Sequence, residues 1–109
     1  MRRVDEAMRE VISGAITSEL KDPRVGFVTV TAVETAPDLH RARVFVSVLG
    51  GDAERRRTLD ALGHAHGYLQ RRVADELRLK HTPTLEFAYD ASAERSQRIA
   101  ELIDGEEAS

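Results

Sequence analysis

The chain has 109 residues, a formal net charge of −3 and no cysteine. This length suits one domain with its own hydrophobic core, and the lack of cysteine excludes disulfides, thiolate metal sites and cysteine nucleophiles. Charged residues interrupt the apolar positions near the N-terminus, so we expect no signal peptide, no membrane span and a cytoplasmic protein.

The first predicted element is an amphipathic helix over residues 3–21, where apolar residues recur at spacings of three and four. Asp22-Pro23 should end it, because a residue before proline avoids the α region. Two strands follow, over 26–35 and 39–49, in which β-branched residues alternate with polar ones. The turn between them, Ala36-Pro37-Asp38, is short, so the strands should pair antiparallel as a hairpin.

Residues 59–83 have the apolar spacing of one long helix, with Asp52 as a candidate cap, but Gly63 and Gly67 lie in its interior. Each interior glycine costs roughly 1 kcal/mol relative to alanine. We therefore interpret Ala65-His66-Gly67 as a kink, at which Gly67 adopts a positive φ or admits another backbone. A continuous helix that tolerates both glycines fits the spacing equally well. His66 falls on the apolar stripe, and we expect it to be partly buried.

A third strand over 85–89 alternates apolar with other residues, and a final helix should begin near Asp90 and Ser92 and end at Gly105. The predicted fold is α+β, with helices on one face of a three-stranded sheet. We expect one domain over 1–104 and an acidic tail over 105–109.

Enzyme motifs are missing from this sequence. We find no His-Glu-x-x-His, no Gly-x-Ser-x-Gly and no phosphate-cradling loop with a lysine. His64 and His66 differ by two positions, which places them about 200° apart on a helix and makes them poor joint ligands. We expect no catalytic residue, metal, cofactor or small-molecule substrate.

The basic residues form a clearer pattern. Residues 53–81 hold seven basic and four acidic residues, and three of the four histidines. Arg57, His64, Arg71 and Arg78 recur every seven residues and so form a stripe along the predicted helix. Such a stripe, together with neighbouring basic residues and Arg43 on a strand, could contact the phosphates of RNA. The candidate RNA-binding residues are Arg43, Arg57, His64, Arg71, Arg72, Arg78 and Lys80. A solvated face with internal ion pairs, such as Arg71 with Asp75, explains the pattern equally well.

On these residues the sequence resembles the bacterial ribosome-binding factor A family. The resemblance rests on Asp22-Pro23-Arg24-Val25-Gly26, Asp38-Leu39, Ala42, Val44 to Leu49, Ala65-His66-Gly67, Leu79, Pro83, Leu85-Glu86-Phe87, Asp90 and Ser92. It implies a type II KH-like fold in which Ala65-His66-Gly67 replaces the usual Gly-x-x-Gly loop. Lys80 stands where the family usually has arginine, which keeps the charge but loses the bidentate fork, and Thr84 stands where it usually has glutamate.

The resemblance also implies a function. Such proteins are non-enzymatic assembly factors that bind the free 30S ribosomal subunit and its 16S rRNA, assist late maturation and pre-rRNA processing, and matter most in the cold. We expect a monomer. The alternative is a small protein-interaction module that uses the exposed sheet face around Phe27 and Phe45. Binding to phosphates would weaken steeply with salt, whereas apolar docking would not.

Overall fold

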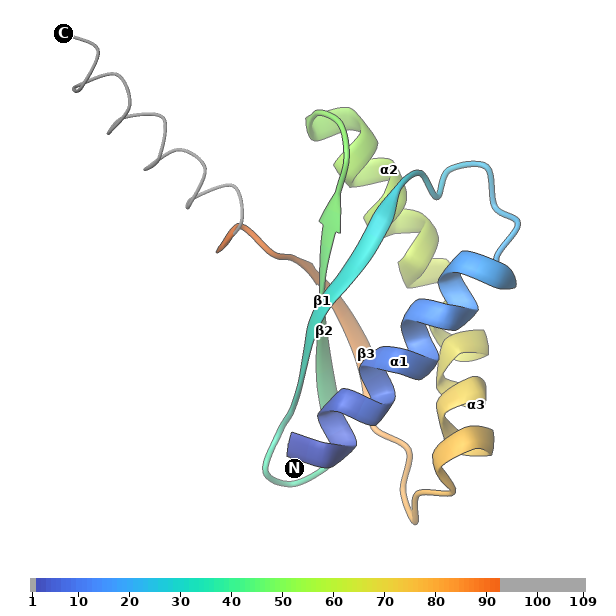
Figure 1. Cartoon of the computed structure of the whole chain (residues 1–109), viewed down its shortest axis with the longest axis vertical. Coiled ribbons are helices and arrows are strands. Elements are labelled where there is room, and N and C mark those ends of the chain that lie inside the picture. Colours follow the sequence, from blue (N-terminus) through green and yellow to red (C-terminus); the bar gives the residue numbers. More distant parts are fainter. Residues whose placement is uncertain (1, 93–109) are drawn as a thin grey trace, which may run out of the picture.

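The computed structural model describes residues 2–92, which form an α+β fold with three helices and a three-stranded sheet (Figure 1). This confirms the predicted fold class and the predicted element order as far as the third strand. The predicted C-terminal helix beyond Ser92 and the acidic tail lie outside the described residues. No helix within residues 2–92 is long and apolar enough to cross a membrane. In chain order the elements are α1 (Arg2–Ser18), β1 (Val28–Thr35), β2 (Arg41–Val48), α2 (Asp52–His64), α3 (His66–Leu77) and β3 (Thr84–Tyr89).

The sheet has the strand order β1-β2-β3, so β2 is central. β1 pairs antiparallel with β2 through the short turn, as predicted, whereas β3 runs parallel to β2. A parallel pair needs a long crossover, and α2 and α3 provide it. The β1–β2 register shifts between Val30 and Ala32, which leaves Thr31 in a β-bulge. The Thr31 hydroxyl donates to Asp90, just after β3, at 2.5 Å.

All three helices lie on one side of the sheet (Figure 1). Alternate residues of β2 point into this layer because side chains of a strand alternate between its two faces. α1 packs against β1 and α3, while α2 and α3 both contact β3. The buried residues at the centre of this core are Met8, Ile12, Ala42, Val44, Val46, Leu62, Leu69 and Val73.

The opposite face of the sheet is polar. Glu34, Arg43 and Glu86 are cross-strand neighbours on β1, β2 and β3. Arg41 Nε lies 3.8 Å from Glu86 Oε1 on the same face. Phe45 is only half-buried there. Charges of alternating sign therefore lie across the three strands on this face.

Two helices end before their predicted boundaries. α1 ends at Ser18, where the Leu20 N–H donates to the Ala15 carbonyl, five residues earlier, at 3.2 Å and so leaves the four-residue α-helical pattern. Asp22-Pro23 is therefore not what stops it. α3 ends at Leu77, because Arg78 adopts the left-handed conformation with φ 48° and ψ 44°. A left-handed residue terminates a helix, although glycine is usual there.

The long helical segment is interrupted, as predicted, but the break is at Ala65, with φ −89° and ψ 2°. The Leu69 N–H donates to the Ala65 carbonyl at 3.0 Å, so α3 begins directly after the break. The prediction for Gly67 is wrong, because it has no positive φ and a Cβ there would meet no atom within 4 Å. His66, predicted to be partly buried, is exposed.

The start of α2 also differs from the prediction. Gly51, not Asp52, is the N-cap residue. Its N–H donates to Glu54 Oε2 at 2.9 Å, so the glutamate three residues into the segment satisfies a backbone donor. Gly50, just before, has φ +123° and lets the chain turn from β2 into α2.

Candidate nucleic-acid interface

The predicted basic stripe is carried by α2, α3 and the residue after α3. Arg57 and His64 are seven residues apart along α2, and Arg71 and Arg78 are seven apart along α3 and its end. Arg57 and His64 therefore project from one side of α2, whereas Arg78 follows the last residue of α3 in a left-handed conformation. All four residues are exposed. The break at Ala65 separates the two pairs, so the seven-residue spacing does not continue from α2 into α3.

These residues differ in whether a carboxylate lies within ion-pair distance of them. Arg57 Nη2 lies 3.4 Å from Glu54 Oε1, and His64 Nδ1 lies 4.0 Å from Asp60 Oδ2. The ion pair between Arg71 and Asp75, the example given for a solvated face, does not form, although Arg57 and Arg72 do pair with carboxylates of their own helices. Five basic residues, which belong to the predicted set or lie next to it, have no carboxylate of residues 2–92 within ion-pair distance. They are Arg43, Arg56, Arg71, Arg78 and Lys80.

Arg72 is placed differently from its neighbours on α3. Its guanidinium lies 3.1 Å from Glu76 and 3.0 Å from Glu19, just after α1. Glu19 also accepts a hydrogen bond from the Tyr68 hydroxyl. The hydrogen bond to Glu76 and the charge of Glu19 raise the pKa of Arg72 above its ordinary value. Arg72 thus joins α1 to α3, and it could contact a phosphate only by giving up these partners.

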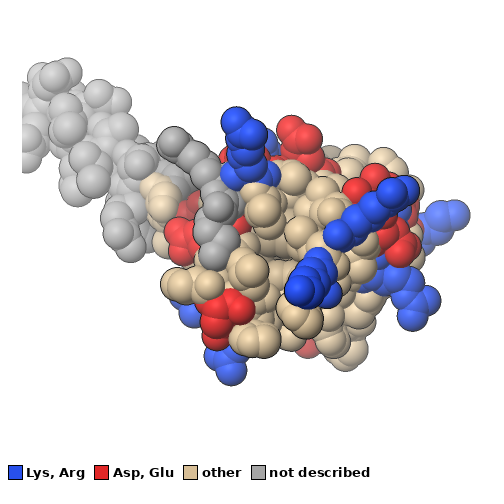
Figure 2. Space-filling view, turned by 90° about the horizontal axis from the view of Figure 1, so that it is seen from below, with Lys and Arg blue, Asp and Glu red and all other residues tan. Residues whose placement is uncertain are grey.

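Arg43 and Lys80 are separated by the sheet and the helices. Arg43 lies on the open face of the sheet, whereas Lys80 and Arg78 belong to the segment between α3 and β3. Figure 2 views the molecule from this end, where Lys and Arg side chains stand apart from one another and Asp or Glu lies beside several of them. The predicted residues therefore do not form one continuous patch, and most of them lie on the helical side.

At the bend between α2 and α3, small residues alternate with two histidines. Gly63 and Gly67 are both exposed on either side of Ala65, and a Cβ at either would meet no atom within 4 Å. His64 Nδ1 donates to the Asp60 carbonyl at 2.9 Å, and His66 Nδ1 donates to the Gly63 carbonyl at 2.7 Å. Both rings therefore bond to the backbone of α2. In the described part of the chain, no three His, Asp or Glu side chains are grouped to hold a metal ion.

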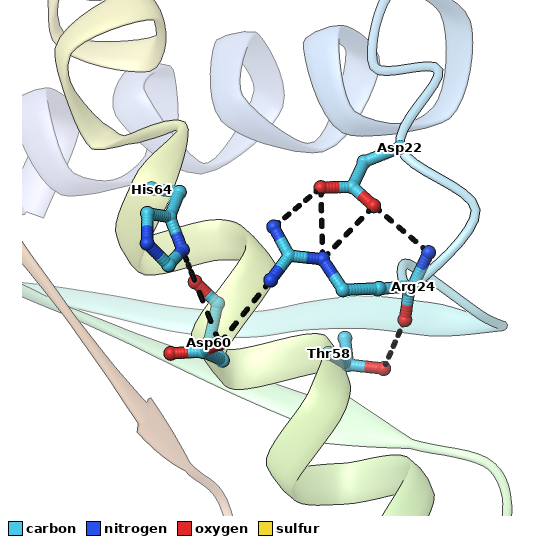
Figure 3. A network of polar contacts seen from close by, with 5 residues as sticks. All are labelled: Asp22, Arg24, Thr58, Asp60 and His64. Carbon is cyan, nitrogen blue, oxygen red and sulfur yellow. Dashed lines mark hydrogen bonds and ion pairs between the residues drawn. The ribbon is translucent and has the colours of Figure 1, made fainter.

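A polar network that the sequence did not indicate ties the loop before β1 to α2 (Figure 3). Arg24 is at its centre, with Nη2 2.8 Å from Asp22 Oδ2 and Nη1 3.2 Å from Asp60 Oδ2. The buried Thr58 donates its hydroxyl to the Arg24 carbonyl at 3.3 Å. Asp60 in turn faces His64, the last residue of α2.

The network changes the acidity of its members. The pKa of Asp22 falls to about 2, because the Arg24 side chain and then the Arg24 backbone N–H hydrogen-bond to its carboxylate. The same side-chain hydrogen bond raises the pKa of Arg24. Asp22 and Arg24 lie two residues apart, a spacing that could have suggested their contact. Asp60 is 36 residues away from Arg24 and could be placed only by the fold.

The sheet surface considered for a protein partner is not one apolar face. Phe45 lies half-buried on a strand whose exposed neighbours are Arg41 and Arg43. Phe27 precedes β1 and is 81% exposed. Leu49, 73% exposed, follows β2 beside it. The two most exposed large apolar residues of the described chain, Phe27 and Leu49, therefore lie together at the end of the sheet, next to the loop of Arg24.

Comparisons with known proteins agree on one family. The family model described as "Ribosome-binding factor A" matches residues 1–103. The ribosome-binding factor A of Desulfitobacterium hafniense is 47% identical over 103 residues, which cover 94% of this chain and 82% of that protein. The crystal structure of ribosome-binding factor A from Thermus thermophilus is 26% identical, with a TM-score of 0.72, over 81% of this chain and 93% of that one.

A further solved structure concerns a complex. It is a homology model of the Thermus thermophilus ribosome-binding factor A, fitted into the cryo-EM map of a complex with the 30S subunit. This chain is 26% identical to it with a TM-score of 0.67, and the match covers 80% of this chain and 91% of that one.

Proposed function

The chain belongs to the ribosome-binding factor A family, and on that basis we propose that it binds the free 30S ribosomal subunit through its 16S rRNA, as an assembly factor without catalytic activity. The relative fitted into a 30S map supports the same partner. The observation that carries the proposal is a set of exposed cations on the helical side that no carboxylate of residues 2–92 neutralises: Arg56, Arg71, Arg78 and Lys80.

Unpaired cations suit phosphate because no ion pair must break before they bind it. Arginine in addition offers a fork of donors that matches the phosphate oxygens. Each phosphate that is neutralised releases counterions, so four contacts give a slope of log K against log salt of about −3 to −4. The net charge of −3 opposes loose adsorption to arbitrary RNA. Binding then favours a site where several phosphates match these positions.

The finer role follows from the family. We propose that the protein acts as a monomer in the cytoplasm, late in small-subunit maturation, and promotes processing of the 16S rRNA precursor. It uses no cofactor or small-molecule substrate. Its contribution is greatest in the cold, because misfolded RNA helices rearrange slowly at low temperature.

Sedimentation with purified ribosomal particles tests the proposal. The protein should sediment with free small subunits and their precursors, and poorly with large subunits or joined ribosomes. Raising the salt should release it along the slope given above. Equal sedimentation with large subunits, or protein that stays at the top of the gradient at low salt, would contradict the assignment. A strain without the protein should accumulate unprocessed 16S precursor, most strongly at low temperature.

A further inference from the structure

A hollow of about 510 Å³ lies at the end of the sheet, away from the unpaired cations of α3. It is formed where the loop before β1 and the residue after β2 approach the first turns of α2. We call it the Phe27 hollow. Its main lining residues are Pro23, Arg24, Phe27, Leu49, Glu54 and Arg57.

Two large apolar side chains flank this hollow and face water. Phe27 is 81% exposed and Leu49 is 73% exposed. The two residues are adjacent, because the Leu49 N–H donates to the Phe27 carbonyl at 3.0 Å. Each Å² of apolar surface left in water forgoes about 25 cal/mol of burial free energy, so a partner that covered both side chains would gain from their burial.

The charges around the hollow are already balanced within the chain. Arg24 lies against Asp22 and Asp60, and Arg57 lies against Glu54. A phosphate would have to compete with these carboxylates. Arg71 and Arg78, by contrast, have no carboxylate within ion-pair distance in the described part of the chain. The hollow therefore suits an uncharged, apolar group better than it suits a nucleic-acid backbone.

The walls of the hollow are fixed before any partner arrives. Thr58 holds the Arg24 carbonyl, and the Arg24 side chain bridges Asp22 and Asp60, so the loop is tied to α2 (Figure 3). A pre-formed surface loses little conformational entropy on binding. Aromatic residues that fill such positions often carry much of the affinity of protein contacts.

We propose that the Phe27 hollow receives a bulky apolar side chain from a protein component of the small subunit, against Phe27 and Leu49. This inference rests on the proposed function, since it requires that the chain binds the subunit. The protein then holds the particle by two unlike contacts. One is cationic and weakens with salt, and the other is apolar and responds little to salt.

The double variant Phe27→Ser/Leu49→Ser tests this, with the single variant Phe27→Ala as a milder change. Both residues are exposed, so the thermal midpoint should stay within a few degrees of the wild type. The matched control is Leu39→Ser, an exposed apolar residue in the turn at the other end of the hairpin. The affinity of each variant is measured for intact small subunits and for protein-free 16S rRNA.

We expect the double variant to bind intact subunits at least tenfold more weakly than the wild type does. Its affinity for protein-free 16S rRNA should equal that of the wild type. The control Leu39→Ser should match the wild type on both targets. Equal losses on both targets would overturn the proposal and show that the hollow contacts RNA. Unchanged affinity for both would show that it contacts neither. If the wild-type protein itself does not bind intact subunits, the proposed function is wrong. That result differs from the two outcomes above, which concern only the variants.

Discussion

Arg24 Nη1 lies 3.2 Å from Asp60 Oδ2, and this contact fastens the loop before β1 to the middle of α2. The same guanidinium lies 2.8 Å from Asp22 Oδ2. One side chain therefore joins two segments that are far apart in the sequence, and it shapes one wall of the Phe27 hollow. The acid sensitivity of the fold follows from this arrangement.

Asp22 should contribute to stability only where it is ionised. Its pKa in the folded chain is about 2, below the ordinary value of 3.8. A carboxylate with a lowered pKa stabilises the fold fully above its unfolded-state pKa, and this stabilisation is lost as pH falls through the folded-state pKa. The pKa of Glu54 is lowered by backbone donors and that of Asp90 by the Thr31 hydroxyl, so both act in the same direction.

Urea unfolding from neutral pH to about pH 2 checks this expectation for Asp22→Asn against the wild type. The difference in free energy of unfolding should be constant above about pH 5 and should shrink steadily as the pH falls to about 2, where half of the wild-type carboxyl is protonated in the folded chain. A difference that persists unchanged at the lowest pH would show that the charge of Asp22 is not what holds Arg24.

Removing the Thr58 hydroxyl should loosen the same loop. Thr58→Val keeps the shape of the side chain but leaves the Arg24 carbonyl without its donor. We expect a loss of about 1 kcal/mol in the free energy of unfolding. The control is Thr29→Val, an exposed strand position where valine fits equally well. If both variants unfold at the same urea concentration, the Thr58 hydrogen bond contributes nothing.

The two glycines at positions 67 and 50 should respond in opposite ways to alanine. Gly67→Ala should raise the stability by up to about 1 kcal/mol, because its φ is ordinary and its Cβ meets open space. Gly50→Ala should lower it, because φ is +123° and the new Cβ would lie 3.0 Å from the Glu54 side chain. Thermal melts decide both. If Gly67→Ala is stable yet binds small subunits weakly, the glycine serves binding rather than folding.

Arg71 and Arg78 should serve binding, whereas Arg72 serves the fold. The double variant Arg71→Gln/Arg78→Gln should keep the thermal midpoint, weaken binding to 16S rRNA and reduce the salt slope by about 1.5 to 2. Arg72→Gln should lower the midpoint, because it loses Glu19 and Glu76, and leave the slope unchanged. A salt slope that falls with Arg72→Gln and not with the double variant would reverse this assignment.

Arg43→Gln asks whether the open sheet face takes part. Arg43 lies between Glu34 and Glu86 on the side away from the helices. The cations that we propose bind RNA lie on the helical side, and a phosphate held there cannot reach Arg43 on the opposite face of the sheet. We therefore expect the affinity for 16S rRNA to remain within about twofold of the wild type. A loss as large as that of the Arg71/Arg78 double variant would mean that RNA contacts both sides of the sheet.

Local patterns predicted the elements but not what brings them together. The apolar spacing of α1 and the alternation in β2 both arise because each element is buried on one side, so the sequence predicts both elements. The parallel pairing of β3 depends on the length of the crossover, and no local pattern carries it. The prediction for Gly67 was wrong because the break is at Ala65, whose φ of −89° and ψ of 2° do not require a glycine.

The candidate site was predictable only in part, for a similar reason. Helical spacing identifies which residues of α3 share a side, but it cannot show what lies opposite them. On an isolated helix the side chain of Arg72 would be exposed. In the fold, α1 ends beside α3, and Glu19 forms an ion pair with Arg72. The contact of Arg24 with Asp60 joins residues 36 positions apart, so no local spacing in the sequence predicts it.

The parallel pairing of β2 with β3 has a consequence for the order of folding. β1 and β2 are joined by a short turn, so their register can form early at little loop-closure entropy. β3 can align with β2 only after residues 49–83 have closed a long loop, and α2 and α3 shorten that loop as they form. We therefore expect φ-values near zero for Leu85→Ala in β3, and higher values for Val44→Ala and Val30→Ala in the hairpin, when folding and unfolding rates are measured.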